Sequence, residues 1–135
     1  MNHPSTKILC IDDDSDDCIF LSESLAANDS GAALVCAHGA EEAIHYLATA
    51  DELPALIVLD LNMPKWDGKK TLAYLKSHPG FSSIPVVILS TSENSADREI
   101  CSRLGAISYM KKPFHFSEYR SIIQSFMPFL RTEQA

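Results

Sequence analysis

Five short apolar runs alternate with longer amphipathic stretches, and this alternation limits the possible folds more than any other feature of the chain. The runs that we expect to form strands are Lys7–Ile11, Ala33–Ala37, Ala55–Leu59, Val86–Leu89 and Ala106–Met110. Near-continuous apolar strands are typical of a parallel sheet that helices cover on both faces. The sequence therefore predicts an α/β fold, a doubly wound five-stranded parallel sheet with five helices.

The stretches between these runs carry apolar residues at helical spacing, for example at Cys18, Leu21 and Leu25. The predicted helices are Ser15–Asn28, Ala40–Thr49, Lys69–Ser77, Ser95–Leu104 and Ser117–Leu130. Gly105 should stop the fourth helix, and Pro128 should disturb the last turns of the fifth. A length of 135 residues fits one domain, so we expect a single domain over 1–135 without an effector domain.

Composition excludes several classes of protein. The formal net charge of −7 argues against a general nucleic-acid binder. No apolar stretch is long enough to span a membrane, and Met1–Lys7 lacks the apolar core of a signal peptide. Cys10, Cys18, Cys36 and Cys101 do not have the spacing of a metal site, so we expect structural thiols in a reducing compartment. These features predict a cytoplasmic protein.

Polar side chains follow four of the predicted strands. In a doubly wound sheet, ligands bind beyond the carboxyl ends of the strands, so these residues are the first candidates for a site. They are Asp12, Asp13 and Asp14 after the first strand, Asp60 after the third, Ser90 and Thr91 after the fourth, and Lys111 and Lys112 after the fifth.

The run Asp12–Asp14 can be a solvated loop or a helix cap, which acids favour. Three acids in a row, with Asp16 and Asp17 close behind, repel one another unless a cation is present. Asp60 favours the cation, because the first and third strands are neighbours in the commonest five-stranded order. Several carboxylates without a nearby His or Cys suit a hard ion such as Mg²⁺.

Asp60 alone can be a capping group or a functional acid. Beside a metal, its carboxylate can attack phosphorus and form an acyl phosphate. Paired lysines are usually solvated, but Pro113 restrains the backbone of Lys112, which can then point inward as a phosphate-binding charge. Lys111 should point the other way.

Ser90 also has two interpretations. A hydroxyl at a strand end most often caps the next helix, a role for which Thr91 and Ser92 compete. It can instead donate a hydrogen bond to a phosphoryl oxygen.

Four motifs together resemble the receiver domains of two-component response regulators, in particular the single-domain chemotaxis-like type. They are I-L-C-I-D-D-D, L-I-V-L-D-L-N-M-P-x-x-D-G, P-V-V-I-L-S-T and G-A-x-S-Y-M-K-K-P-F. The resemblance covers about residues 6–130. It implies the flavodoxin-like receiver fold, with strand order 2-1-3-4-5.

The resemblance also implies a role for each matched acid. Asp60 becomes the phosphoacceptor, and Mg²⁺ is held by Asp13, Asp60 and the backbone carbonyl of Asn62, with Asp12 acting through water. Asn62 also occupies one of two positions that tune dephosphorylation in the family, and Ser92 occupies the other.

The remaining matches describe a switch. Lys112 and Ser90 hold the phosphoryl oxygens, and Tyr109 is the switch aromatic. Ser90 stands where Thr is equally familiar, which should be tolerated. Thr91 stands where the family usually has a small residue, which should slightly reduce access to the phosphoryl group.

The expected function is a phosphoacceptor signalling switch whose only chemistry is self-phosphorylation and slow autodephosphorylation. Its partner is a sensor histidine kinase or a histidine phosphotransfer protein, and its downstream target is unknown. We expect no DNA or membrane binding, and a monomer or a weak homodimer. The apolar end of the last helix, Phe126–Leu130, packs in the core or forms a dimer face.

Two alternatives come from other classes. A magnesium-dependent phosphohydrolase with an aspartyl nucleophile normally has a second acid two residues later, where this chain has Asn62. A pseudo-receiver would serve only as an interaction module, against which the intact site speaks.

Overall fold

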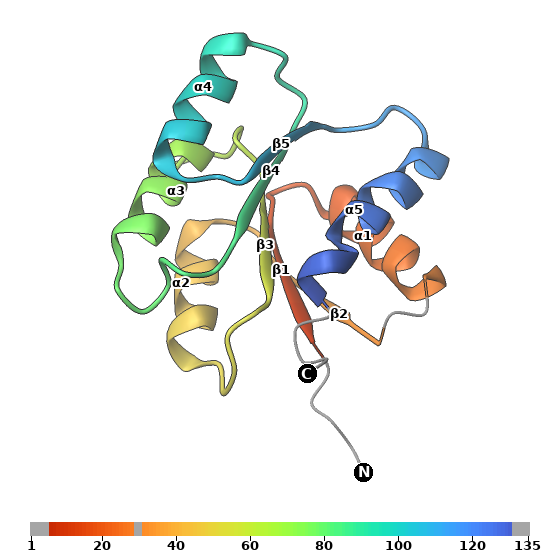
Figure 1. The fold of residues 1–135 in the computed structure, drawn as a ribbon, viewed down its shortest axis with the longest axis horizontal. Helices are drawn as coiled ribbons and strands as arrows, with labels where there is room; N and C mark the ends of the chain where they lie inside the picture. Colours follow the sequence, from red (N-terminus) through yellow and green to blue (C-terminus); the bar gives the residue numbers. More distant parts are fainter. Residues whose placement is uncertain (1–5, 29–30, 131–135) are drawn as a thin grey trace.

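The five strands form one parallel sheet in the order β2-β1-β3-β4-β5 (Figure 1), in a computed structural model that describes residues 6–28 and 31–130. This is the predicted order. The strands are β1 (Lys7–Ile11), β2 (Ala33–Ala37), β3 (Leu56–Leu59), β4 (Val86–Ser90) and β5 (Ser108–Lys111). Parallel pairing brings the carboxyl ends of all five to one edge.

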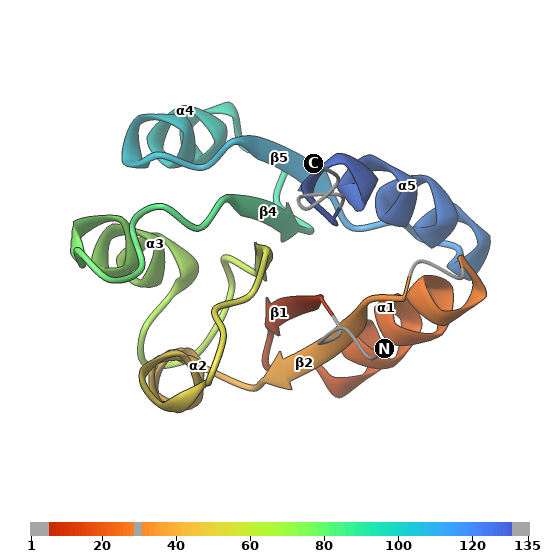
Figure 2. The same cartoon turned by 60° about the horizontal axis from the view of Figure 1, so that its bottom comes forward.

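The helices cover both faces of the sheet, as the sequence predicts. In Figures 1 and 2, α1 and α5 lie on one face, and α2, α3 and α4 lie on the other. Their bounds are α1 (Ser15–Ala27), α2 (Ala40–Thr49), α3 (Gly68–Ser77), α4 (Ser95–Leu104) and α5 (Tyr119–Leu130), with a 3₁₀ turn at Phe116–Glu118.

Alternation along each strand divides the core in two. In β1, Leu9 and Ile11 pack on the side of α2, α3 and α4, while Ile8 and Cys10 pack on the side of α1 and α5. Successive side chains of a strand point to opposite faces, so a strand buried on both sides must be apolar throughout. The inner strands are therefore anchored rigidly, and so are the residues that follow them.

Two sequence predictions near the C-terminus need correction. Strand β5 begins at Ser108 rather than Ala106, because Gly105 adopts a left-handed conformation and the Ala106 N–H donates to the carbonyl of Cys101. Helix α5 begins at Tyr119, after the 3₁₀ turn, rather than at Ser117, and it ends at Leu130 as predicted, with Pro128 inside it.

The prediction of four free thiols is wrong for one pair. Cys18 of α1 and Cys36 of β2 form a disulfide, with Cα atoms 6.3 Å apart, within the range that a disulfide spans. The packing of α1 against β2 brings them together, and sequence spacing does not reveal that contact. Cys10 and Cys101 are free and buried, as predicted. The cysteines therefore no longer support a reducing compartment.

The apolar end of α5 belongs to the core. Phe126 is fully buried, and Met127, Phe129 and Leu130 are partly buried against the same cluster. None of the helices in the described ranges 6–28 and 31–130 is long and apolar enough to cross a membrane.

Candidate functional site

The predicted acids meet at the carboxyl ends of β1 and β3. The backbone N–H of Asp60 donates to the carbonyl of Ile11 at 3.0 Å, which places the residues that follow the two strands side by side. One carboxylate oxygen each from Asp12, Asp13 and Asp60 lies within 4.8 Å of the other two. Asp12 and Asp60 are buried, whereas Asp13 is exposed.

Backbone N–H groups orient the two buried carboxylates. The Asp14 N–H donates to Asp12 Oδ1 at 2.9 Å, and the Asn62 N–H donates to Asp60 Oδ1 at 3.3 Å. Asp14 caps α1 by accepting from the Asp16 N–H. Asp14 thus has the capping role, while its two predecessors Asp12 and Asp13 join the acidic cluster.

Lys112 supplies a cation to this cluster. Its Nζ lies 2.9 Å from Asp12 Oδ2, 3.6 Å from Asp60 Oδ2 and 2.6 Å from Asp17 Oδ2. Its backbone N–H donates to the Ser90 carbonyl at 2.8 Å, which continues the pairing of β4 with β5 beyond the strand. Lys111 pairs instead with Glu93, so the two lysines point to different surroundings, as the sequence predicts.

Burial dominates the ionisation of the cluster. It raises the pKa of Asp12 to about 7, with a further contribution from the charge of Asp60. Burial also raises the pKa of Asp60, which Lys112 partly offsets. Burial alone lowers the pKa of Lys112, but its hydrogen bonds to Asp17 and Asp12 hold it above the ordinary value. One ammonium is therefore shared among more carboxylates than it neutralises.

Gly68 lets the loop after β3 fold back onto Asp60. Its N–H donates to the Leu61 carbonyl at 2.9 Å. A Cβ at this position would lie 2.6 Å from Leu61 Cα and would collide with the Asp60 carbonyl oxygen. Since both contacts are backbone, neither can move aside easily. The D-G pair of the motif is thus explained, with Asp67 capping α3 and Gly68 permitting the close approach.

An open hollow of about 430 Å³ gives access to the cluster. Its walls combine carboxylates, a side-chain amide, hydroxyls and one ammonium. The lining residues are Asp13, Asp14, Ser15, Asp60, Asn62, Thr91 and Lys112. Thr91 is among them, and its predicted effect on access to the site stays a prediction.

The donor set fits a hard divalent cation. The three clustered groups offer carboxylate oxygens only, the ligands that Mg²⁺ and Mn²⁺ prefer. Burial raises the pKa of Asp12 and Asp60, the charge of Asp60 adds to this at Asp12 and the charge of Asp13 adds to it at Asp60, and a cation would offset these effects.

Of the predicted switch residues, Lys112 lines the hollow, whereas Ser90 and Tyr109 do not. Ser90 is fully buried, and its Oγ accepts from the Ser92 N–H at 3.2 Å. The Tyr109 hydroxyl donates to the Ser92 carbonyl at 3.1 Å, while Arg98 lies over the Tyr109 ring. Asn94, not a residue of 90–92, caps α4, which corrects the sequence expectation. Ser90 therefore has no capping role. The hydrogen bond of Tyr109 to the Ser92 carbonyl connects the tyrosine to the loop that follows Ser90.

Asp17 is the site residue that the sequence analysis missed. Besides Lys112, it accepts a hydrogen bond from the Tyr119 hydroxyl at 3.2 Å. From the sequence alone, Asp17 is only one of several acids close together that repel one another. Its spacing of four from the buried Leu21 places it on the inner edge of α1, and that signal could have singled it out.

Known proteins resemble this chain over most of its length. The profile of the response regulator receiver domain matches residues 8–124. The response regulator Rcp1 of Synechocystis sp. is 30% identical over 133 residues, which covers 95% of this chain and 90% of Rcp1.

Solved structures extend the similarity. The phosphorylated cyanobacterial phytochrome response regulator RcpA has a TM-score of 0.86 at 32% identity and covers 98% of both chains. The Mn(2+)-bound form of Rcp1 has a TM-score of 0.82 at 30% identity and covers 94% of this chain and 96% of Rcp1. The chain belongs to the response regulator receiver domain family of two-component signalling.

Proposed function

We propose that the chain is a phosphoacceptor switch of a two-component phosphorelay, with Asp60 as the residue that carries the phosphoryl group. The observation that carries this proposal is the buried Asp60 carboxylate, which opens into the hollow beside Asp12 and Asp13, with the Lys112 ammonium 3.6 Å away. The solved relatives described as phosphorylated and as Mn(2+)-bound support it.

The proposed donor is a phosphohistidine on a sensor histidine kinase or a histidine phosphotransfer protein. One Oδ atom of Asp60 attacks phosphorus, a P–O bond forms as the P–N bond breaks, and the imidazole nitrogen keeps the electron pair. Lys112 favours the ionised carboxylate, which is the attacking form. Burial restricts water around this carboxylate, so the charge of Lys112 acts strongly on it.

Asp13, Asp60 and the backbone carbonyl of Asn62 would hold Mg²⁺, with Asp12 acting through water. When bound, Mg²⁺ neutralises charge on the transferring group. Lys112 donates to one phosphoryl oxygen. The Ser90 hydroxyl donates to another after it turns away from the Ser92 N–H, its partner in this structure.

Movement of Ser90 is proposed to carry the signal outward. The Tyr109 ring then gives up the Ser92 carbonyl and turns inward, which changes the surface of α4, β5 and α5 that a partner reads. This is a shift between two populated states, driven by the new charge-assisted contacts. Partner binding by Tyr109→Ala should depend less on phosphorylation, and an unchanged dependence would show that the coupling is wrong.

Other sequence predictions stay predictions. Asn62 and Ser92 are proposed to tune the phosphoryl lifetime, and the protein is proposed to turn over no separate substrate. Asn62 cannot transfer a proton, so nothing in the described site favours the phosphohydrolase alternative. The cytoplasmic location, the absence of DNA and membrane binding, and the monomer or weak homodimer are likewise untested.

Acetyl phosphate tests the proposal without a partner kinase. With Mg²⁺, the intact wild-type mass should rise by one phosphoryl group, and a chelator should prevent the change. Asp60→Asn should stay unmodified, while Asp51→Asn, at an exposed loop position, should label like the wild type. An unmodified wild type, under conditions that label a known receiver, would contradict the proposal.

A further inference from the structure

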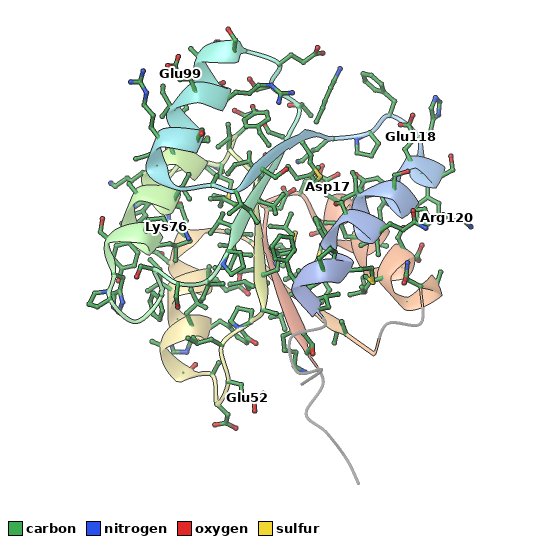
Figure 3. The ribbon with its side chains drawn as sticks, viewed as in Figure 1. Asp17, Glu52, Lys76, Glu99, Glu118 and Arg120 are labelled. Carbon is green, nitrogen blue, oxygen red and sulfur yellow. A yellow bond between two sulfur atoms is a disulfide. The ribbon has the colours of Figure 1, made fainter. Side chains whose placement is uncertain are left out.

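Asp17 joins Lys112 to the first turn of α5. It lies in the first turn of α1, and its side chain is only 13% exposed. Its Oδ2 lies 2.6 Å from Lys112 Nζ, and its Oδ1 accepts from the Tyr119 hydroxyl at 3.2 Å. In Figure 3 it lies within the outline of the molecule, whereas the labelled Glu52 and Glu99 lie at its edge.

We infer that Asp17 is a positioning residue that competes with the phosphoryl group for Lys112 and passes the outcome to α5 through Tyr119. The inference deepens the proposed function and rests on it. It assigns to this carboxylate two effects, which are to draw the Lys112 ammonium toward α1 before phosphorylation and to reduce the affinity of the site for an anion.

The Lys112 ammonium lies closer to Asp17 than to the proposed phosphoacceptor. Asp17 lies nearest at 2.6 Å, Asp12 follows at 2.9 Å, and Asp60 lies farthest at 3.6 Å. The ammonium is thus displaced from the proposed acceptor toward α1. Because the Lys112 backbone is fixed by its bond to the Ser90 carbonyl, the side chain supplies any movement toward a phosphoryl group.

Asp17 and the hollow lie on different sides of the Lys112 ammonium. Among the described residues, those that line the hollow do not include Asp17, which therefore meets Lys112 from behind. A phosphoryl group on Asp60 would add negative charge on the other side of the same ammonium. A lysine ammonium is a compact point charge with three donors, so it can redistribute its hydrogen bonds between the two sides.

Tyr119 connects Asp17 to the start of α5. It is the first residue of α5, it is buried, and its ring lies 5.7 Å from that of Phe20 and 6.4 Å from that of Phe116. A ring held in this way keeps its hydroxyl directed at Asp17. When Lys112 shifts toward the phosphoryl group, Tyr119 becomes the main remaining donor to Asp17, and the first turn of α5 responds.

Affinity for the phosphoryl mimic BeF₃⁻ in the presence of Mg²⁺ tests the competition. Asp17→Asn should bind the mimic about three- to tenfold more tightly, because one competing charge is removed and Lys112 is released. Asp16→Asn removes the same charge one residue away, at an exposed position, and should match the wild type within about twofold. A purely structural role for Asp17 predicts weaker binding, so unchanged or weaker binding by Asp17→Asn overturns the inference.

Tyr119→Phe gives a second test of opposite sign. Without the tyrosine hydroxyl, Asp17 holds Lys112 more strongly, so the mimic should bind about twofold more weakly. The same substitution should have no effect in the Asp17→Asn background, and an equal effect in both backgrounds overturns the inference. Should Asp17→Asn fail to fold, Tyr119→Phe decides alone, and unchanged or tighter binding overturns the inference.

Binding of the mimic by the wild type distinguishes a failure of the proposed function from a failure of the role inferred for Asp17. If the wild type does not bind the mimic, the proposed function is wrong and the inference fails with it. If the wild type binds but Asp17→Asn does not bind more tightly, the inference alone is wrong.

Discussion

Two regions at the same edge of the sheet are built very differently. The acceptor end consists of Asp12, Asp60 and Lys112, and its two acids follow β1 and β3, inner strands that are almost completely buried. The switch end consists of residues 91–94 and the edge strand β5, whose four residues are only half-buried. Pairing of β5 with β4 on one side and side-chain contacts, such as that of the Tyr109 hydroxyl with the Ser92 carbonyl, hold the switch end in place.

This difference matches two tasks. Phosphoryl transfer requires an acid and a metal site that keep their geometry, which the buried inner strands β1 and β3 provide. A readout requires two arrangements separated by a few kcal/mol at most, which a half-buried edge strand that pairs on one side only provides. Substitutions at the acceptor end should therefore reduce stability much more than substitutions at the switch end.

Gly68→Ala should produce the largest effect. The added Cβ meets backbone atoms of Asp60 and Leu61, so the free energy of unfolding should fall by about 3 to 4 kcal/mol. Urea unfolding measures this change. Gly39→Ala is the matched control, since a Cβ there meets nothing within 4 Å, and it should lose less than about 1 kcal/mol. Equal losses of unfolding free energy in the two variants would mean that Gly68 is not closely packed against the backbone of Asp60 and Leu61.

Lys112→Met should follow. It leaves buried carboxylates without their cation, so the free energy of unfolding should fall by about 2 to 3 kcal/mol at neutral pH. Lys111→Met breaks only the more exposed pair with Glu93 and should change stability by less than about 0.5 kcal/mol. If the two lysines prove equivalent in urea unfolding, Lys112 does not serve the acceptor end as described.

Acidification should stabilise the metal-free protein at the acceptor end. The pKa of Asp12 rises from 3.8 to about 7 on folding, so the native state binds more protons than the unfolded state between these values. The contribution of Asp12 to stability therefore decreases by about 2 to 3 kcal/mol as the pH rises from about 4 to about 7. Asp12→Asn should remove the share of Asp12 and leave only the dependence that Asp60 contributes, which unfolding curves at several pH values would measure.

Mg²⁺ should reverse that trend. It binds the ionised acids, so it should stabilise the wild type more at pH 8 than at pH 5, as metal binding to the native state alone requires. A stabilisation by Mg²⁺ that persists unchanged in Asp13→Asn would place the metal elsewhere.

Tyr109→Phe should give the smallest effect. It removes one hydrogen bond at the switch end, so the free energy of unfolding should fall by about 0.5 to 1 kcal/mol. Amide hydrogen exchange in β5 and α4 should accelerate, while exchange in β1 and β3 should not change. A loss as large as that of Lys112→Met would erase the distinction between the two ends.

The fold could be predicted from the sequence because its cause is local. Strands such as Leu56–Leu59 are buried on both sides of the sheet. A short run of apolar residues in the sequence is therefore enough to predict such a strand and its burial. The start of β5 was misplaced because an edge strand is less apolar and because the cap at Gly105 extends to Ala106.

The site could be predicted only in part. Asp12, Asp60 and Lys112 follow strands, so parallel pairing dictates where they meet. Spacing from Leu21 places Asp17 on the inner edge of α1, but the partners of Asp17 and the Cys18–Cys36 disulfide depend on how α1 packs against its neighbours, which spacing along the chain does not encode. The partner of Ser90 was likewise beyond the sequence, since it depends on the turn that residues 91–94 adopt.

The central claim is that Asp60 itself carries the phosphoryl group. The most direct test is to label the wild type with acetyl phosphate and Mg²⁺, reduce the acyl phosphate with borohydride to homoserine, and locate that residue by peptide mass spectrometry. The account predicts homoserine at position 60 and unmodified aspartate at positions 12, 13 and 17. Homoserine at one of those three positions, with aspartate intact at 60, would contradict it.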